Sequence, residues 1–261
     1  MDFIVKADDG NYARYEELIL KRDEVKKQAR QYSILYIHEF GEAITALFEE
    51  KVRCIKVKRY IGYCISKINA RQDIDAEKME EQLEKEMAQY YATLKEMAEE
   101  SAACRELKRV PEADAAAVKQ KYRQLVKKLH PDINPKTSEN KVLSELWQRL
   151  VTAYETSDIE ETEEVEVLIN NALEALGEGA EEIVIPDIEE KIKKIEAQIE
   201  KITSTDPYRY KFLLEDAEAV KVKKKALADE LKEYKAYKKE LEEKLDEILI
   251  NSGVRLSWRM K

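Results

Sequence analysis

The chain has 261 residues, of which 39% are charged and 44% are apolar, with only 6 glycines and 5 prolines. This composition favours long helices and disfavours a turn-rich β protein or a disordered chain. The formal net charge of −9 disfavours binding of the whole molecule to nucleic acid or to an anionic membrane surface, because both attract a basic protein.

The cysteines and the first residues narrow the class of protein further. Cys54, Cys64 and Cys104 are widely spaced and odd in number, so we expect neither a disulfide framework nor a zinc site. The start MDFIVKADD lacks the basic and apolar regions of a signal peptide, and no window of about 18 residues is apolar and uncharged. We therefore expect a cytoplasmic protein without a membrane segment, a metal or a cofactor.

Residues 1–103 are expected to form long helices. The first apolar stripe has the three- and four-residue spacing of an amphipathic helix, with Arg22 as its one polar interruption. This stripe consists of Tyr15, Leu18, Val25, Ala29, Tyr32 and Tyr36.

A denser apolar segment follows, in which the sequence allows a helix break anywhere between Gly41 and Gly62. Asp73 or Asp75 is positioned to cap the next amphipathic helix. The stripe of that helix consists of Met79, Leu83, Met87, Tyr90, Leu94 and Met97.

Residues 104–157 change to shorter helices. One begins near Asp114 and stops at Pro131, and a second, capped by Ser138, follows the intervening loop. The apolar face of the first comprises Val118, Tyr122, Leu125 and Leu129, and its basic face comprises Lys119, Lys121, Arg123, Lys127 and Lys128. The second carries Leu143, Leu146, Trp147, Leu150 and Tyr154. Pairing the two apolar faces gives a helical hairpin with His130-Pro131-Asp132 exposed at its tip.

Residues 158–186 are acidic, and no Lys or Arg occurs between Leu150 and Glu190. Ser157-x-x-Glu160 forms a capping box that would start a helix here. One hypothesis places residues 158–176 against Lys119, Arg123 and Lys127. The simpler alternative is a solvated acidic face that serves solubility.

Residues 187–261 show the clearest coiled-coil spacing. An isoleucine stripe ends at a break around Pro207, and a longer stripe follows it, which predicts an antiparallel hairpin. The stripes are Ile188, Ile192, Ile195, Ile199 and Ile202, then Val220, Leu227, Leu231, Tyr234, Leu241, Leu245 and Ile248. Self-packing is the simpler interpretation, and a surface for another protein is the alternative.

Four functions can be considered for the tripeptide His130-Pro131-Asp132. A His–Asp catalytic pair lacks a nucleophile and a second acid, and a metal site lacks further ligands. A helix-turn-helix DNA reader needs a turn of about three or four residues, shorter than this loop. Recognition by a protein remains, so we expect no enzyme and no catalytic residue.

The residues around this string resemble the J domain of the DnaJ co-chaperone family. The matching positions are Leu107, Tyr122-Arg123-x-Leu125, His130-Pro131-Asp132, Asn134 and Trp147-x-x-Leu150-x-x-Ala153-Tyr154. The chain departs from the family pattern at Cys104 (usually aromatic), Lys108 (usually Gly), Gln124 (often basic) and Ile133 (usually basic). The loop is also longer than the common form, and no fourth helix with a basic tail is evident.

We expect an all-α protein in which a J domain, implied by the resemblance, is embedded between long N-terminal helices and a C-terminal antiparallel coiled coil, both predicted from apolar spacing. The resemblance implies docking on a DnaK-type heat-shock ATPase, whose ATP hydrolysis the J domain stimulates, while the helical arms bind a client or partner protein. The implied contact residues are His130, Pro131, Asp132, Lys119, Tyr122, Arg123, Lys127, Lys128 and Asn134. The alternative is a coiled-coil scaffold whose J-like hairpin no longer engages the ATPase.

Overall fold

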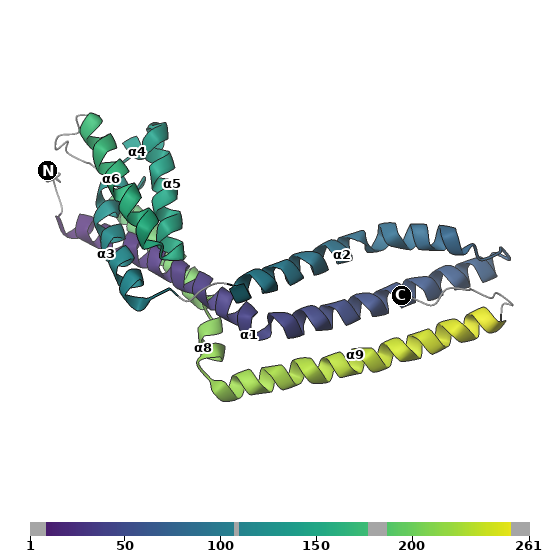
Figure 1. Ribbon diagram of the computed structural model, residues 1–261. Coiled ribbons are helices and arrows are strands. Elements are labelled where there is room, and N and C mark those ends of the chain that lie inside the picture. Colours follow the sequence, from purple (N-terminus) through teal and green to yellow (C-terminus); the bar gives the residue numbers. More distant parts are fainter. Residues whose placement is uncertain (1–8, 107–109, 177–186, 252–261) are drawn as a thin grey trace. The chain divides into compact units, whose positions relative to one another are not determined.

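A computed structural model describes residues 9–106, 110–176 and 187–251, and the regular structure in these ranges is entirely helical (Figure 1). The expected all-α class is therefore confirmed. The helices are α1 (Asp9–Asn69), α2 (Ala76–Glu106), α3 (Glu112–Leu129), α4 (Lys136–Glu139), α5 (Lys141–Thr156), α6 (Ile159–Ala175), α7 (Ile188–Ser204), α8 (Tyr210–Leu214) and α9 (Ala217–Asn251). None of these helices is long and apolar enough to cross a membrane.

Helix α1 runs for 61 residues without a break between Gly41 and Gly62, where the sequence allows one. A glycine in a helix costs only about 1 kcal/mol, which the packing of a long helix readily offsets. A Cβ at Gly41 would lie 2.9 Å from the Ser101 hydroxyl, whereas one at Gly62 would meet nothing within 4 Å. Gly41 therefore permits a close approach of α2.

The chain folds into two compact units built from non-consecutive segments. The first unit combines the described parts of Met1–Tyr32 and Lys108–Arg209, and the second combines those of Ser33–Leu107 and Tyr210–Lys261. These units differ from the consecutive domains expected from the sequence. The reason is that α1 contributes its first turns to one unit and its remainder to the other.

The first unit buries the apolar faces of α3 and α5 together, as the sequence predicts. The start of α1 and the helices α6 and α7 complete this core with Tyr15, Ile19, Val25, Val165, Ile169, Ile192, Ile195 and Ile199. Two caps differ from the expected ones. Asn140 rather than Ser138 caps α5, and Asp158 rather than Ser157 caps α6, because these side chains accept the free backbone N–H groups.

The second unit packs the remainder of α1 against α2 and α9. Asp75 caps α2 by accepting the backbone N–H groups of Glu77 and Lys78. The buried residues of this core are Cys54, Val57, Tyr60, Ile61, Cys64, Met79, Leu83, Leu241, Leu245 and Leu249. Cys54, Cys64 and Cys104 are all unpaired and buried.

The two stripes expected to pack on each other as a C-terminal hairpin instead contribute to different cores. Ile192, Ile195 and Ile199 of α7 are buried in the first core. Leu241 and Leu245 of α9 are buried in the second core. Heptad spacing identifies the apolar face of a helix, but it does not say which other face will cover it.

Candidate functional site

The His-Pro-Asp loop begins where α3 ends. His130 has φ −64° and ψ 127°, the extended conformation that a following proline favours. The His130 carbonyl accepts the N–H groups of Ile133 and Asn134 at 2.9 and 2.7 Å. The Asn134 side chain donates to the Lys128 carbonyl at 3.0 Å and accepts from the Lys136 N–H at 3.1 Å. Asn134 is buried, so this expected contact residue fixes the loop from within.

His130 is buried with 4% of its surface exposed, which corrects the expectation of an exposed tip. Its ring meets Trp147 edge to face, with the ring centroids 4.8 Å apart. On the other side, Arg22 of α1 places Nη2 3.0 Å from His130 Nε2. The cause of the burial is therefore a helix remote in sequence, which the pattern around the loop did not reveal.

The contacts of His130 require a neutral imidazole. The backbone N–H of Asp132 donates to Nδ1 at 3.0 Å, while the Arg22 guanidinium approaches Nε2. A doubly protonated ring would have no acceptor for either donor, whereas a neutral ring has one acceptor nitrogen and accepts a hydrogen bond from one of the two. Burial of the ring lowers the pKa of His130 to about 4, and the carboxylates of Asp23 and Asp132 only partly oppose this effect.

Asp132 remains half exposed, and its carboxylate forms an ion pair with Arg22 Nη1 at 3.3 Å. Pro131, between His130 and Asp132 in the sequence, is partly exposed. Ile133, which departs from the family pattern, is fully buried in the first core. An apolar residue thus suits that position, since a cation there would lose its hydration.

Tyr122 also lies inside the unit, which differs from its expected role as a contact residue. Its ring stacks on Tyr154 with centroids 3.9 Å apart and planes 11° from parallel. Its hydroxyl donates to Asp23 at 2.9 Å, and burial raises the pKa of Tyr122 far above its usual value. Tyr122 therefore links α3, α5 and α1.

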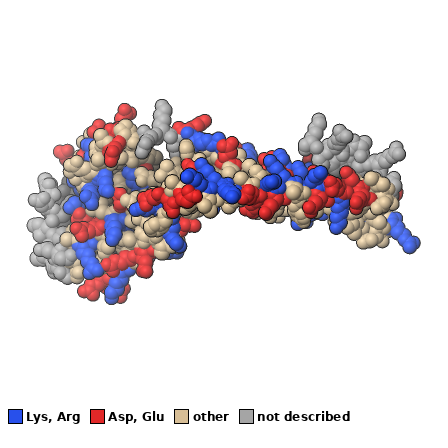
Figure 2. Space-filling view, turned by 90° about the horizontal axis from the view of Figure 1, so that it is seen from below, with Lys and Arg blue, Asp and Glu red and all other residues tan. Residues whose placement is uncertain are grey.

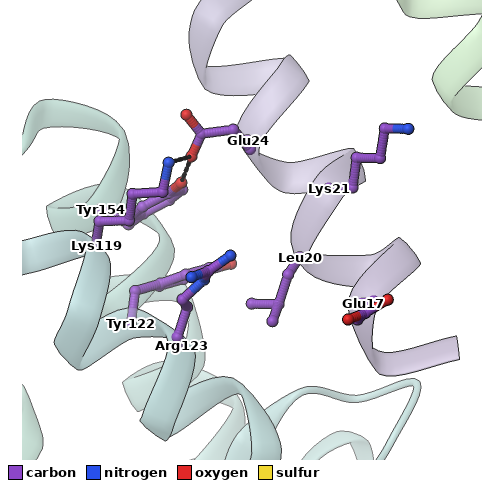
Figure 3. A pocket seen from close by; sticks show the side chains of 8 residues that line it. All are labelled: Glu17, Leu20, Lys21, Glu24, Lys119, Tyr122, Arg123 and Tyr154. Carbon is purple, nitrogen blue, oxygen red and sulfur yellow. Dashed lines mark hydrogen bonds and ion pairs between the residues drawn. The ribbon is translucent and has the colours of Figure 1, made fainter. Parts of the chain in front are cut away.

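The basic face of α3 is lined by acids from α1. Lys119 pairs with Glu24 at 3.0 Å, and Lys127 pairs with Glu16 at 2.8 Å. Figure 3 shows Lys119, Arg123 and Tyr122 around a cavity of about 310 Å³, whose opposite wall includes Glu17, Leu20 and Lys21 of α1. Arg123 itself is exposed.

The acidic helix α6 contacts other cations than those proposed from the sequence. Glu166 and Glu163 lie 2.7 and 3.6 Å from Lys121, and Arg149 of α5 binds Glu161 and Glu164. Lys128 donates to Asn170 of α6 at 3.1 Å. The hypothesis that α6 covers Lys119, Arg123 and Lys127 is therefore wrong, because α1 supplies the acids that pair with Lys119 and Lys127.

Sequence reasoning missed Glu16, Arg22, Asp23 and Glu24 as parts of this site. One signal was present, since Arg22 interrupts an otherwise apolar stripe. Its side chain is largely buried and ion-paired with Asp23 and Asp132. A polar residue on a buried helical face needs such partners, which makes the interruption a marker of a specific contact.

Among the described residues, no group of His, Cys, Asp and Glu is arranged to hold a metal ion. Leu107 and Lys108, used in the resemblance, lie outside the described residues. Comparison of the chain with protein-family models, curated proteins and solved structures found no match.

Proposed function

We propose that this protein is a J-domain co-chaperone that docks on a DnaK-type heat-shock ATPase and stimulates its ATP hydrolysis. The observation that supports this function best is the arrangement of an apolar face, a basic face and the His-Pro-Asp loop on α3. One face packs on α5, the other bears Lys119, Arg123 and Lys127, and His130-Pro131-Asp132 follows directly at the helix end.

In this proposal the chain contributes binding and no bond chemistry of its own. Basic side chains on α3 attract an acidic surface of the ATPase, and ionic strength screens this attraction. The half-exposed carboxylate of Asp132 is the group that the loop presents to a partner. Pro131 restricts the loop, so little conformational freedom is lost on binding.

The attraction would be local. Figure 2 shows basic and acidic side chains intermingled over the face in view. Together with the net charge of −9, this mixture provides no extended basic surface on that face. The proposal assigns the guidance of a partner to Lys119, Arg123 and Lys127 of α3.

A structural scaffold that binds no ATPase is the second candidate, and the burial of His130 favours it. A histidine held between Arg22 and Trp147 has a packing role whether or not a partner exists. The two candidates differ in one measurable property, the effect of the chain on ATP hydrolysis by the chaperone.

The test is the steady-state ATPase rate of the cognate DnaK-type chaperone with the purified full chain. We expect stimulation by the wild type, loss of stimulation for His130→Gln and Asp132→Asn, and wild-type behaviour for His38→Gln. His38 is the other histidine of the chain and is exposed. Asp132→Asn preserves the shape of a half-exposed side chain but removes the ion pair with Arg22, so thermal unfolding of the variant checks that the fold is retained. The unstimulated ATPase rate in the presence of each of the four proteins, wild type included, would favour the scaffold.

A further inference from the structure

We propose that residues 16–24 of α1, here named the cover segment, mask the docking surface and that the ATPase binds only when this segment has moved away. This inference rests on the proposed co-chaperone function. It goes further by assigning a regulatory element to the chain.

The first support is the contact at the loop. Arg22 uses two different nitrogens, Nη1 on Asp132 at 3.3 Å and Nη2 on His130 at 3.0 Å. A single side chain of the cover segment thus engages both the first and the last residue of His-Pro-Asp. A partner that recognises these two groups must displace Arg22.

The second support is charge pairing on the basic face. Glu16 and Glu24 bind Lys127 and Lys119, two of the three cations that the proposed function assigns to docking. Lys119 and Lys127 are about half exposed, so water reaches them and competing carboxylates can replace those of α1. The cover segment therefore presents to α3 the same acidic chemistry that its partner would present.

The third support is the packing between the cover segment and its neighbours. Two open cavities of about 310 Å³ each adjoin it, one beside Arg123 (Figure 3) and one between Arg22, His130 and Trp147. Both cavities are open to solvent, so water reaches the polar contacts between the cover segment and its neighbours. Tyr15 and Val25 hold α1 in the core on either side of the cover segment, and Ile19 within it is also buried, so release of the segment must expose Ile19 as well as break the polar contacts.

Masking has a defined thermodynamic consequence. If only a fraction of molecules is open, the apparent Kd for the ATPase is the intrinsic Kd divided by that fraction. Weakening the contacts of the cover segment must then tighten the apparent affinity, up to the limit of complete opening. Binding of the ATPase must in turn increase the exposure of the cover segment, because linkage is reciprocal.

The first experiment measures binding of the ATP-bound chaperone to full-length variants. Glu16→Gln with Glu24→Gln, and separately Arg22→Gln, should lower the apparent Kd on the order of tenfold. The matched controls are Glu163→Gln with Glu166→Gln, which removes the acids facing Lys121, and Arg14→Gln, which removes the α1 arginine paired with Glu196. The controls should bind like the wild type.

The second experiment holds the cover segment in place. Arg30 of α1 and Glu155 of α5 form an ion pair outside the basic face, and both are accessible. Arg30→Cys with Glu155→Cys, bridged by a reducible thiol crosslinker, should lose binding and ATPase stimulation and regain both after reduction. Each single cysteine variant, treated with the same reagent, is the control.

The outcomes separate the inference from the function on which it rests. If the wild type binds through His130 but neither the glutamine variants nor the crosslink alters binding, the cover segment has no masking role and the co-chaperone function stands. If no variant binds or stimulates the chaperone, both proposals are overturned. Tighter binding of the α6 control variants by the same factor would also overturn the assignment to α1.

Discussion

Tyr122 and Tyr154 stack face to face, and their hydroxyls reach two neighbouring acids of α1. Tyr122 donates to Asp23 at 2.9 Å, and Tyr154 donates to Glu24 at 2.7 Å. The pair therefore joins α3, α5 and α1 through one aromatic stack. Because the stack lies beneath the basic face, its hydrogen bonds position the acid that meets Lys119.

Removing these hydroxyls should weaken the first unit without disturbing the stacking. We expect Tyr122→Phe and Tyr154→Phe each to lower the free energy of unfolding by about 1–2 kcal/mol, because a partly buried carboxylate loses a donor. Urea denaturation checks this. Tyr91→Phe, at a side chain with 41% exposure in α2, is the control and should change stability by less than about 0.5 kcal/mol.

The lowered pKa of His130 makes stability depend on pH. The unfolded residue binds a proton below its ordinary pKa of 6.5, but the folded one does so only near pH 4. Stability from this residue is therefore complete above pH 6.5 and is lost as the pH falls toward 4. The loss between pH 7 and pH 5 should be about 2 kcal/mol. His130→Gln should remove this part of the slope and His38→Gln should retain it; equal slopes in both variants would contradict the burial of a neutral ring.

The two cores should respond separately to a buried charge. Ile195→Asp should speed amide hydrogen exchange in α3, α5 and α6, and Leu241→Asp should do so in α2 and α9, because each buries a carboxylate in its own unit. Each loss should exceed about 3 kcal/mol. Val222→Asp, at an exposed position of α9, serves as the control. If both substitutions instead opened α7 and α9 together, those helices would be each other's partners.

The two glycines of α1 should differ in their response to alanine. Gly62→Ala adds a methyl group into open space and should stabilise the helix by up to about 1 kcal/mol. Gly41→Ala brings Cβ to 2.9 Å from the Ser101 hydroxyl and 3.1 Å from an Ile37 methyl, so it should lose that gain and destabilise the second unit. Thermal unfolding of the two variants measures the contrast, and a higher Tm for Gly41→Ala would refute the close approach of α2.

Arg123 tests the basic face without removing an ion pair to the cover segment. We expect Arg123→Gln to reduce the association rate with the DnaK-type chaperone several-fold at low salt and to have less effect at high salt. Lys193→Gln, an exposed cation of α7, removes the same charge elsewhere in the unit. Equal association rates for these two variants would argue against steering by α3.

The sequence predicts which face of each helix is buried better than it predicts which other helices cover that face. Met79, Leu83 and Met87 are buried as their spacing indicates, and so are Val118, Leu125 and Leu129. The stripes of α7 and α9 also form apolar faces as their spacing predicts, yet they contribute to different cores. Spacing reports one helix at a time, whereas partner choice depends on contacts between segments far apart in the chain.

The candidate site likewise combines features that follow from local sequence with contacts that do not. The basic face and the loop follow from residues 112–138, where local helix and proline rules apply. The burial of His130 depends on Arg22, which lies 108 positions away in the sequence. Arg22, the one polar residue in the first apolar stripe, indicates that a specific polar contact exists. It does not indicate that His130 is the residue contacted.

Because of their positions, the three native cysteine thiols can report the opening of the second unit alone. Cys54, Cys64 and Cys104 all belong to the second unit, and burial raises the pKa of each thiol, which keeps it protonated and unreactive. An alkylating reagent will therefore modify the wild-type chain at the rate at which that unit opens. The first unit contributes no sulfhydryl signal, so the kinetics of labelling follow the opening of one half of the molecule even while the other half binds a partner.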